Sequence, residues 1–132
     1  MIRGFASVRI RYRVRFPVRP VYAIISHMEA YEEAQIVAKA LEAAKAEDVK
    51  IYDVRGKSSL TDFFVVATGS AAPHLKALVA DAQQALRDAG VHRNRMTGDP
   101  ECGWIVADFI DVVVHVFSRE ARAYYAIERL WT

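Results

Sequence analysis

The sequence predicts a single α/β (α+β) domain in which helices pack on one mixed β-sheet. Segments with helical and strand periodicity follow one another in the order helix, strand, strand, helix, strand, strand, helix. The length of 132 residues suits one domain of ordinary size. A composition that is 53% hydrophobic and 26% charged can bury a core. The composition excludes a wholly disordered chain. The length argues against two independent folding units.

The first three elements are a helix and two strands. Residues 30–47 are rich in Ala, Glu, Lys and Leu, and their apolar positions recur at helical spacing, which predicts an amphipathic helix. A strand is expected over 49–54, followed by a turn over 55–59. A second strand is expected over 62–68. Its apolar run has no alternation, which is typical of a central strand covered on both faces.

A second helix is expected to begin at Pro73, after a serine, and to end at Gly90, because apolar residues recur three and four positions apart between them. Residues 92–101 are polar and turn-rich, so a loop is expected there.

Two further strands and a helix complete the expected domain. The strands cover 104–108 and 112–117, and residues 109–111 join them as a tight hairpin. Within the second of these strands His115 alternates with valines, so a satisfied sheet histidine is expected. The last helix is expected over 119–131, with Ser118 as its cap.

Charge is distributed unevenly along the chain. Residues 1–28 hold six arginines and no acid, whereas the remaining residues hold 12 basic and 16 acidic side chains, a net charge of about −4. We expect 1–28 to be a basic N-terminal extension, either disordered or read from a mis-assigned start that precedes the natural Met28. An arm that touches RNA and an organellar targeting segment stay open as alternatives. The acidic body, residues 29–132, suits a basic protein partner.

Several catalytic and ligand-binding patterns are incomplete. Gly56-Lys57-Ser58 lacks the second glycine of a phosphate-binding loop, and no Asp-x-Asp pair occurs anywhere. The single Cys102 could pair with His74 or His115 as a nucleophile, but a lone cysteine is usually inert. We therefore expect no enzyme, with a nucleotidyltransferase-like activity kept as the alternative.

The same reasoning applies to ligands and membranes. The four histidines are scattered without metal-ligand spacing, and no apolar run approaches the ~20 residues of a membrane span. We expect no cofactor, no metal, no membrane segment and no direct small-molecule ligand.

Two clusters of residues stand out as a candidate protein-binding surface. Trp104, Asp108, Phe109 and Asp111 surround the expected hairpin, and a second group around the 55–62 turn consists of Ser58, Ser59, Thr61 and Asp62. A large aromatic ring beside carboxylates is typical of a binding hot spot for a basic partner. The alternative is that the Trp104 ring simply fills the core.

Several ordered blocks carry a resemblance to a known family. Residues 53–70 read DVRGKSSLTDFFVVATGS, followed by His74, and residues 104–108, 111–117 and 128–131 read WIVAD, DVVVHVF and ERLW. In these blocks the sequence resembles the ribosomal silencing factor, or Iojap, family over essentially all of residues 30–132. Residues 1–28 have no counterpart in the resemblance.

The resemblance implies a small, often dimeric α/β domain that binds large-subunit protein fourteen. Family members bound there prevent the small ribosomal subunit from joining and reduce translation when nutrients are short, while organellar relatives act in large-subunit assembly. We therefore expect a cytoplasmic translational repressor, or an organellar protein if 1–28 is a targeting signal, with large-subunit assembly as the alternative role. The expected partner-binding residues are Trp104, Asp108, Phe109, Asp111, Ser58, Ser59 and Asp62.

The sequence departs from the family pattern in two places. Ile110 stands where the family usually has glycine, and a β-branched residue resists positive φ, so the turn is expected to differ or to be strained. Residues 71–73, Ala-Ala-Pro, replace a more polar run before His74, which is expected to change how the long helix begins.

Overall fold

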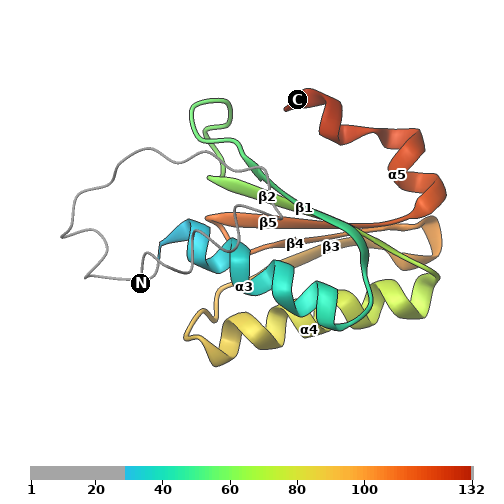
Figure 1. Cartoon of the computed structure of the whole chain (residues 1–132), viewed down its shortest axis with the longest axis horizontal. Coiled ribbons are helices and arrows are strands. Elements are labelled where there is room, and N and C mark those ends of the chain that lie inside the picture. The colour runs from blue at the N-terminus through green and yellow to red at the C-terminus, as the bar shows by residue number, and fades with distance from the viewer. Residues whose placement is uncertain (1–28, 132) are drawn as a thin grey trace.

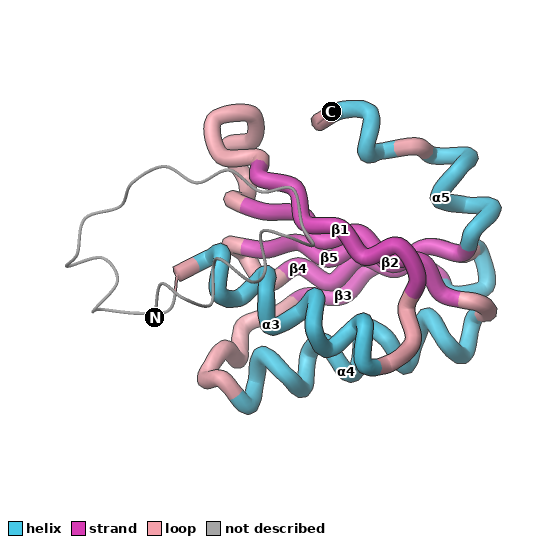
Figure 2. Tube along the Cα trace, viewed as in Figure 1, coloured by secondary structure: helices cyan, strands magenta, loops and turns pink. Residues whose placement is uncertain are grey.

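The protein forms one mixed five-stranded sheet with helices packed on it, which confirms the predicted fold class (Figures 1 and 2). The computed structural model describes residues 29–131. The expectations for residues 1–28 lie outside the described residues. The elements are α3 (Ala30–Ala43), β1 (Glu47–Asp53), β2 (Phe63–Gly69), α4 (Ala72–Asp88), β3 (Arg95–Asp99), η1 (Pro100–Cys102), β4 (Trp104–Asp108), β5 (Val112–Ser118), α5 (Arg119–Tyr125) and η2 (Ile127–Leu130).

The strand order in the sheet is β1-β2-β5-β4-β3. Strand β5 lies at the centre, parallel to β2 and antiparallel to β4. The two outer strands pair antiparallel, β1 with β2 and β3 with β4. The expected hairpin between β4 and β5 is confirmed, because the Phe109 amide donates to the Val112 carbonyl at 2.9 Å.

Helices α3 and α4 cover the same face of the sheet (Figure 1). Each places one apolar stripe against the strands, as the 3.6-residue period predicts. The buried apolar residues of the two helices are Ala30, Tyr31, Ala34, Val37, Ala38, Leu41, Leu75, Leu78, Val79, Ala82 and Leu86. They meet alternate residues of the central strands, such as Val65, Ala107 and Val114, in one continuous core.

Residues 95–99, which the sequence predicted to lie in a loop, form the edge strand β3. All five residues are exposed, so no apolar alternation marks them as a strand. Their pairing with β4 supplies the hydrogen bonds that define it.

Two helices end earlier than predicted. Helix α3 ends at Ala43 because Lys45 adopts a left-handed φ of 71° and the Ala46 amide returns to the Leu41 carbonyl at 2.9 Å. Helix α5 ends at Tyr125 because Ala126 adopts φ 48°, and a short 3-10 helix, η2, follows. At the start of α5, Ser118 accepts a hydrogen bond from the Ala121 amide, as predicted.

Candidate functional site

The sheet face opposite α3 and α4 carries most of the aromatic side chains of the strands. We call it the aromatic face and define it by Tyr52, Phe64, Trp104, His115 and Phe117. The registers place these residues in adjacent rows, with Tyr52 beside Phe64 and Trp104 beside Phe117. Three of these five rings belong to a second apolar cluster, separate from the core under the helices, that also holds Val66 and Ala121.

Trp104 is half-buried on this face. Its ring lies 4.6 Å from Tyr125, 5.0 Å from Phe117 and 5.9 Å from His115, measured between ring centroids. Its indole Nε1 donates to His115 Nδ1 at 3.2 Å. The ring therefore packs on its neighbours while part of it stays accessible from solvent.

His115 is only partly satisfied, although the sequence predicted a satisfied sheet histidine. Its Nδ1 accepts from Trp104, so the ring proton lies on Nε2. That Nε2 is buried and has no hydrogen-bond partner among the described residues. Burial lowers the pKa of His115 to about 4, so the ring is neutral near pH 7.

Asp108 lies on the same side of β4 as Trp104, because side chains four residues apart in a strand share a face. The two side chains stand at opposite ends of the strand, roughly 13 Å apart along it. Asp108 Oδ1 accepts from the Ile110 amide at 2.8 Å and so shapes the turn. Ile110 adopts φ 78°, which confirms the expected backbone strain.

Asp62 and Asp111 lie together at the turn end of the sheet. The amides of Asp62 and Phe63 both donate to the Asp111 carbonyl, at 3.1 and 3.2 Å. Ser58, nearby in the chain, accepts from the Leu60 amide through its hydroxyl, and Ser59 is exposed. The structure thus joins the turn and the hairpin that the sequence analysis singled out separately.

Phe109 takes a different position from the one predicted. Its side chain is 1% exposed and packs in the core beneath α3 and α4. It points inward because it continues the alternation of β4, in which Ile105 and Ala107 face the core. Direct contact between this ring and a partner would require the turn to unfold, so we remove Phe109 from the candidate contact residues.

The sequence analysis missed Glu33 and Arg93 at this end of the molecule. Arg93 bridges the Glu33 carboxylate at 3.1 Å and the Asp111 carboxylate at 3.0 Å. Glu33 is 2% exposed, and its burial, reinforced by Asp111 and Asp62, raises its pKa to about 7 even though Arg93 lowers it. The sequence did offer a sign of this buried acid, because Glu33 stands on the apolar stripe of the helix between Ala30 and Val37.

The other chemical candidates are occupied by structural contacts. Cys102 is exposed and donates to Asp99 at 3.4 Å, and this hydrogen bond raises the pKa of its thiol. His74 accepts from the Ser70 amide at 2.9 Å through Nδ1 and donates through Nε2 to the Ala44 carbonyl at 2.8 Å. It therefore ties the start of α4 to the end of α3.

The Gly56-Lys57-Ser58 segment is a tight turn. The amides of Lys57 and Ser58 both donate to the Val54 carbonyl. Within residues 29–131 no group of three His, Cys, Asp or Glu side chains is placed to hold a metal ion. None of the helices in that range is long and apolar enough to span a membrane.

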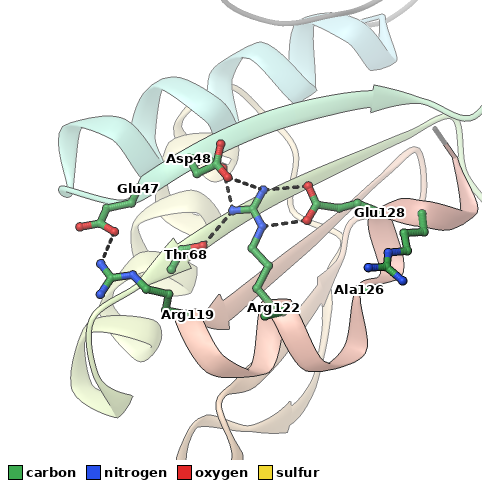
Figure 3. A pocket seen from close by; sticks show the side chains of 9 residues that line it. Glu47, Asp48, Thr68, Arg119, Arg122, Ala126 and Glu128 are labelled. Atoms are coloured by element: carbon green, nitrogen blue, oxygen red, sulfur yellow. Dashed lines mark hydrogen bonds and ion pairs between the residues drawn. The ribbon is translucent and has the colours of Figure 1, made fainter.

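A shallow pocket of about 460 Å³ lies between α5 and the start of β1 (Figure 3). Three acids and three arginines line it: Glu47, Asp48, Glu128, Arg119, Arg122 and Arg129. Arg122 binds Glu128 and Asp48, and Arg119 binds Glu47. Two of the three arginines thus pair with the acids of the pocket, and the pocket contains none of the predicted site residues.

Comparison with known proteins gives a consistent set of matches. The family model described as "Ribosomal silencing factor during starvation" matches residues 27–132. The ribosomal silencing factor of Treponema pallidum is 42% identical over 107 residues, which cover 79% of this chain and 94% of that protein. A mouse protein named "Mitochondrial assembly of ribosomal large subunit protein 1" is 26% identical over 109 residues, 80% of this chain and 48% of that protein.

Solved structures agree with these sequence matches. The crystal structure of a Chromobacterium violaceum protein superimposes with a TM-score of 0.71 and is 37% identical, covering 79% of this chain and 87% of that one.

Proposed function

Because this chain belongs to the ribosomal silencing factor family, we propose that it binds the large ribosomal subunit through large-subunit protein fourteen and blocks joining of the small subunit. Fewer joined ribosomes would slow translation when nutrients are limiting. The observation that carries the proposal is the aromatic face with Trp104 and Asp108 half-exposed on one side of β4. The family is named for ribosomal silencing, and we propose no catalytic residue.

The chemistry of this face suits a basic protein. The Trp104 ring offers apolar area, and Asp108 at the far end of the same strand offers a carboxylate. Val106 lies between them and is also half-buried, so the three side chains form a continuous strip along one face of β4. We propose that Asp111, Asp62, Ser58 and Ser59 extend this contact around the turn, where the two carboxylates select a basic partner.

Large-subunit assembly is the second candidate function. It is favoured by the printed name of the mouse relative, which refers to assembly of the ribosomal large subunit. The same face would serve both roles. Silencing predicts that the protein binds mature large subunits and lowers the number of joined ribosomes, whereas assembly predicts binding to precursor particles alone.

Sedimentation with purified large subunits tests the proposal. We expect Trp104→Ala to weaken binding by more than ~1 kcal/mol, the scale of a hot-spot truncation, and Asp108→Lys to weaken it through like-charge repulsion. Asp81→Lys is the matched control, because it makes the same charge change on an exposed position of α4, across the sheet. Melting curves of each variant separate lost binding from lost folding.

Two results would contradict the proposal. An unmutated protein that fails to co-sediment with large subunits removes the docking function. If Asp81→Lys and Asp108→Lys weakened binding to large subunits equally, the loss would reflect the net charge of the protein and would not define a binding surface. Adding small subunits to the bound complex then measures joining directly, and analytical sedimentation of the free protein tests the homodimer, which stays a prediction.

A further inference from the structure

The chain after α5 turns back over the aromatic face. Ala126, in the left-handed conformation, ends α5, and η2 then leads to Trp131. The Trp131 ring stacks on Phe64 with centroids 4.2 Å apart and planes 28° apart. Figure 1 shows this segment on the side of the sheet opposite α3 and α4.

Trp131 thereby covers part of the surface to which we assign the ribosomal partner. Phe64 lies in the same cross-strand row as Val113 of β5 and Asp108 of β4. The Phe64 ring also lies 5.0 Å from the His115 ring and is tilted to it by 41°, so Trp131, Phe64 and His115 form a continuous row of ring contacts. A partner that packed on Asp108 and continued along this row would meet Trp131.

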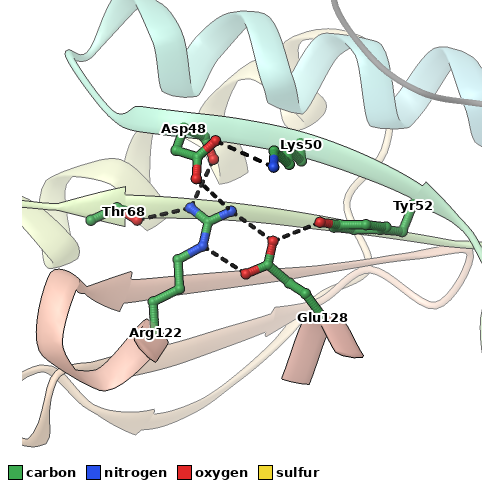
Figure 4. Close-up of polar contacts among 6 residues, drawn as sticks. All are labelled: Asp48, Lys50, Tyr52, Thr68, Arg122 and Glu128. Carbon is green, nitrogen blue, oxygen red and sulfur yellow. Dashed lines mark hydrogen bonds and ion pairs between the residues drawn. The ribbon is translucent and has the colours of Figure 1, made fainter. Parts of the chain in front are cut away.

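The segment is held firmly at Glu128. Both Glu128 carboxylate oxygens accept from Arg122 at 2.9 Å, and one also accepts from the Tyr52 hydroxyl at 2.6 Å (Figure 4). Arg122 is itself buried and reaches the Thr68 hydroxyl and the Asp48 carbonyl. This network fixes the start of the segment to β1 and β2.

Beyond Glu128 the attachments are few. The Lys57 ammonium group donates to the Trp131 carbonyl at 3.4 Å in an exposed contact, and the Trp131 ring makes the stack on Phe64. No residue of η2 is buried, and Leu130 is 73% exposed. Segments with few buried contacts open locally at little cost in free energy, whereas a charged network such as that at Glu128 resists opening.

We propose that residues 129–131 form a lid, anchored at Glu128, that must leave Phe64 before the ribosomal partner can cover the aromatic face. The inference rests on the proposed function and adds a regulatory step to it. Opening also uncovers the Phe64 ring that packs against His115, whose buried Nε2–H has no acceptor among residues 29–131 in the closed state. A carbonyl of the partner or a water molecule can then accept from it, which offsets part of the cost of opening.

The lid predicts a gain of affinity when its contact is removed. If only the open state binds, the apparent dissociation constant is the intrinsic one divided by the open fraction. The loss of one aromatic stack raises that fraction, so Trp131→Ala should tighten binding to large subunits by roughly three- to tenfold. Leu130→Ala is the matched control, since it truncates the adjacent, exposed residue and should leave affinity unchanged.

The outcomes separate the lid from the docking function. Weaker or unchanged binding by Trp131→Ala, with normal binding by the unmutated protein, overturns the lid and leaves the function intact. If the unmutated protein does not bind, the docking function fails, and amide hydrogen exchange decides whether the segment opens. The Trp131 amide, bonded to the Glu128 carbonyl, should exchange at least about tenfold faster than the amides of β5; equal protection overturns the lid.

Discussion

Ile110 is the residue most at odds with its backbone. It holds φ 78° in the β4–β5 turn and is 55% exposed, so its side chain gains little from burial. A β-branched residue in the left-handed region is strained, and glycine is not. We expect Ile110→Gly to raise the free energy of unfolding by about 1 kcal/mol, measured by urea denaturation. Ile110→Ala, which keeps a Cβ, should gain less; equal stability of all three proteins would contradict the strain.

Glu33 gives the fold a pH dependence. Its folded pKa of about 7 lies above the ordinary value of 4.5, so the folded state binds its proton more tightly than the unfolded state does. The stabilisation is complete below pH 4.5 and is lost as the pH rises through 7. We expect Glu33→Gln, relative to the unmutated protein, to gain on the order of 2 kcal/mol of stability between pH 4.5 and 7.5.

The measurement is urea denaturation across that pH range. Glu101→Gln makes the same change at an exposed position and should run parallel to the unmutated protein at every pH. A Glu33→Gln curve that also runs parallel would show that the Glu33 carboxylate does not titrate in this window.

At the scale of elements, Arg122 joins α5 to the sheet. Its side chain is 9% exposed and pairs with Glu128, whose pKa it holds near 2 through their hydrogen bond. Arg122→Met would leave Glu128 without its cation and the Thr68 hydroxyl without its donor, so we expect a loss of about 3 kcal/mol in unfolding free energy. Arg119→Met, at an ion pair with Glu47 in which both side chains are exposed, should cost much less than Arg122→Met. Similar losses for both variants in chemical denaturation would contradict a special role for Arg122.

Most elements could be predicted because their apolar periodicity reflects burial. The end of α4 carries the glycine signal, Gly90 with positive φ, whereas α3 uses Lys45 and α5 uses Ala126 in the same conformation. Lysine and alanine are good helix formers, so nothing in the local sequence marks those ends. Strand β3 was missed because an exposed edge strand buries no face.

At the scale of the whole molecule, the sequence predicts which residues are candidates for the site, whereas their arrangement in space comes from the structure. Trp104 and Asp108 share a face because the strand period requires it. The parallel register between β2 and β5 joins residues far apart in the chain, and this register brings Asp62 against Asp111. Sequence periodicity carries no information on such pairing, although the alternation along β4 does place Phe109 inward, after Ile105 and Ala107.

The whole molecule also sets an expectation for residues 1–27. Residues 29–131 already hold a continuous core and the aromatic face, and the family match begins at 27. We expect a chain that starts at Met28 to melt within about 3 °C of the full chain and to bind large subunits equally at 200 mM salt. At 50 mM salt the six arginines should make the full chain bind more tightly, through contacts with phosphate. If the chain that starts at Met28 bound large subunits more weakly at both salt concentrations, residues 1–27 would take part in the specific contact with the subunit.

The two tryptophans of the chain both lie on the aromatic face, Trp104 against His115 and Trp131 against Phe64. The protein therefore carries its own optical reporters on the surface assigned to the ribosome. Intrinsic fluorescence of the unlabelled chain should respond when that surface is covered. Replacing either tryptophan assigns the response to the strand or to the lid, so docking and opening can be timed separately in a stopped-flow experiment.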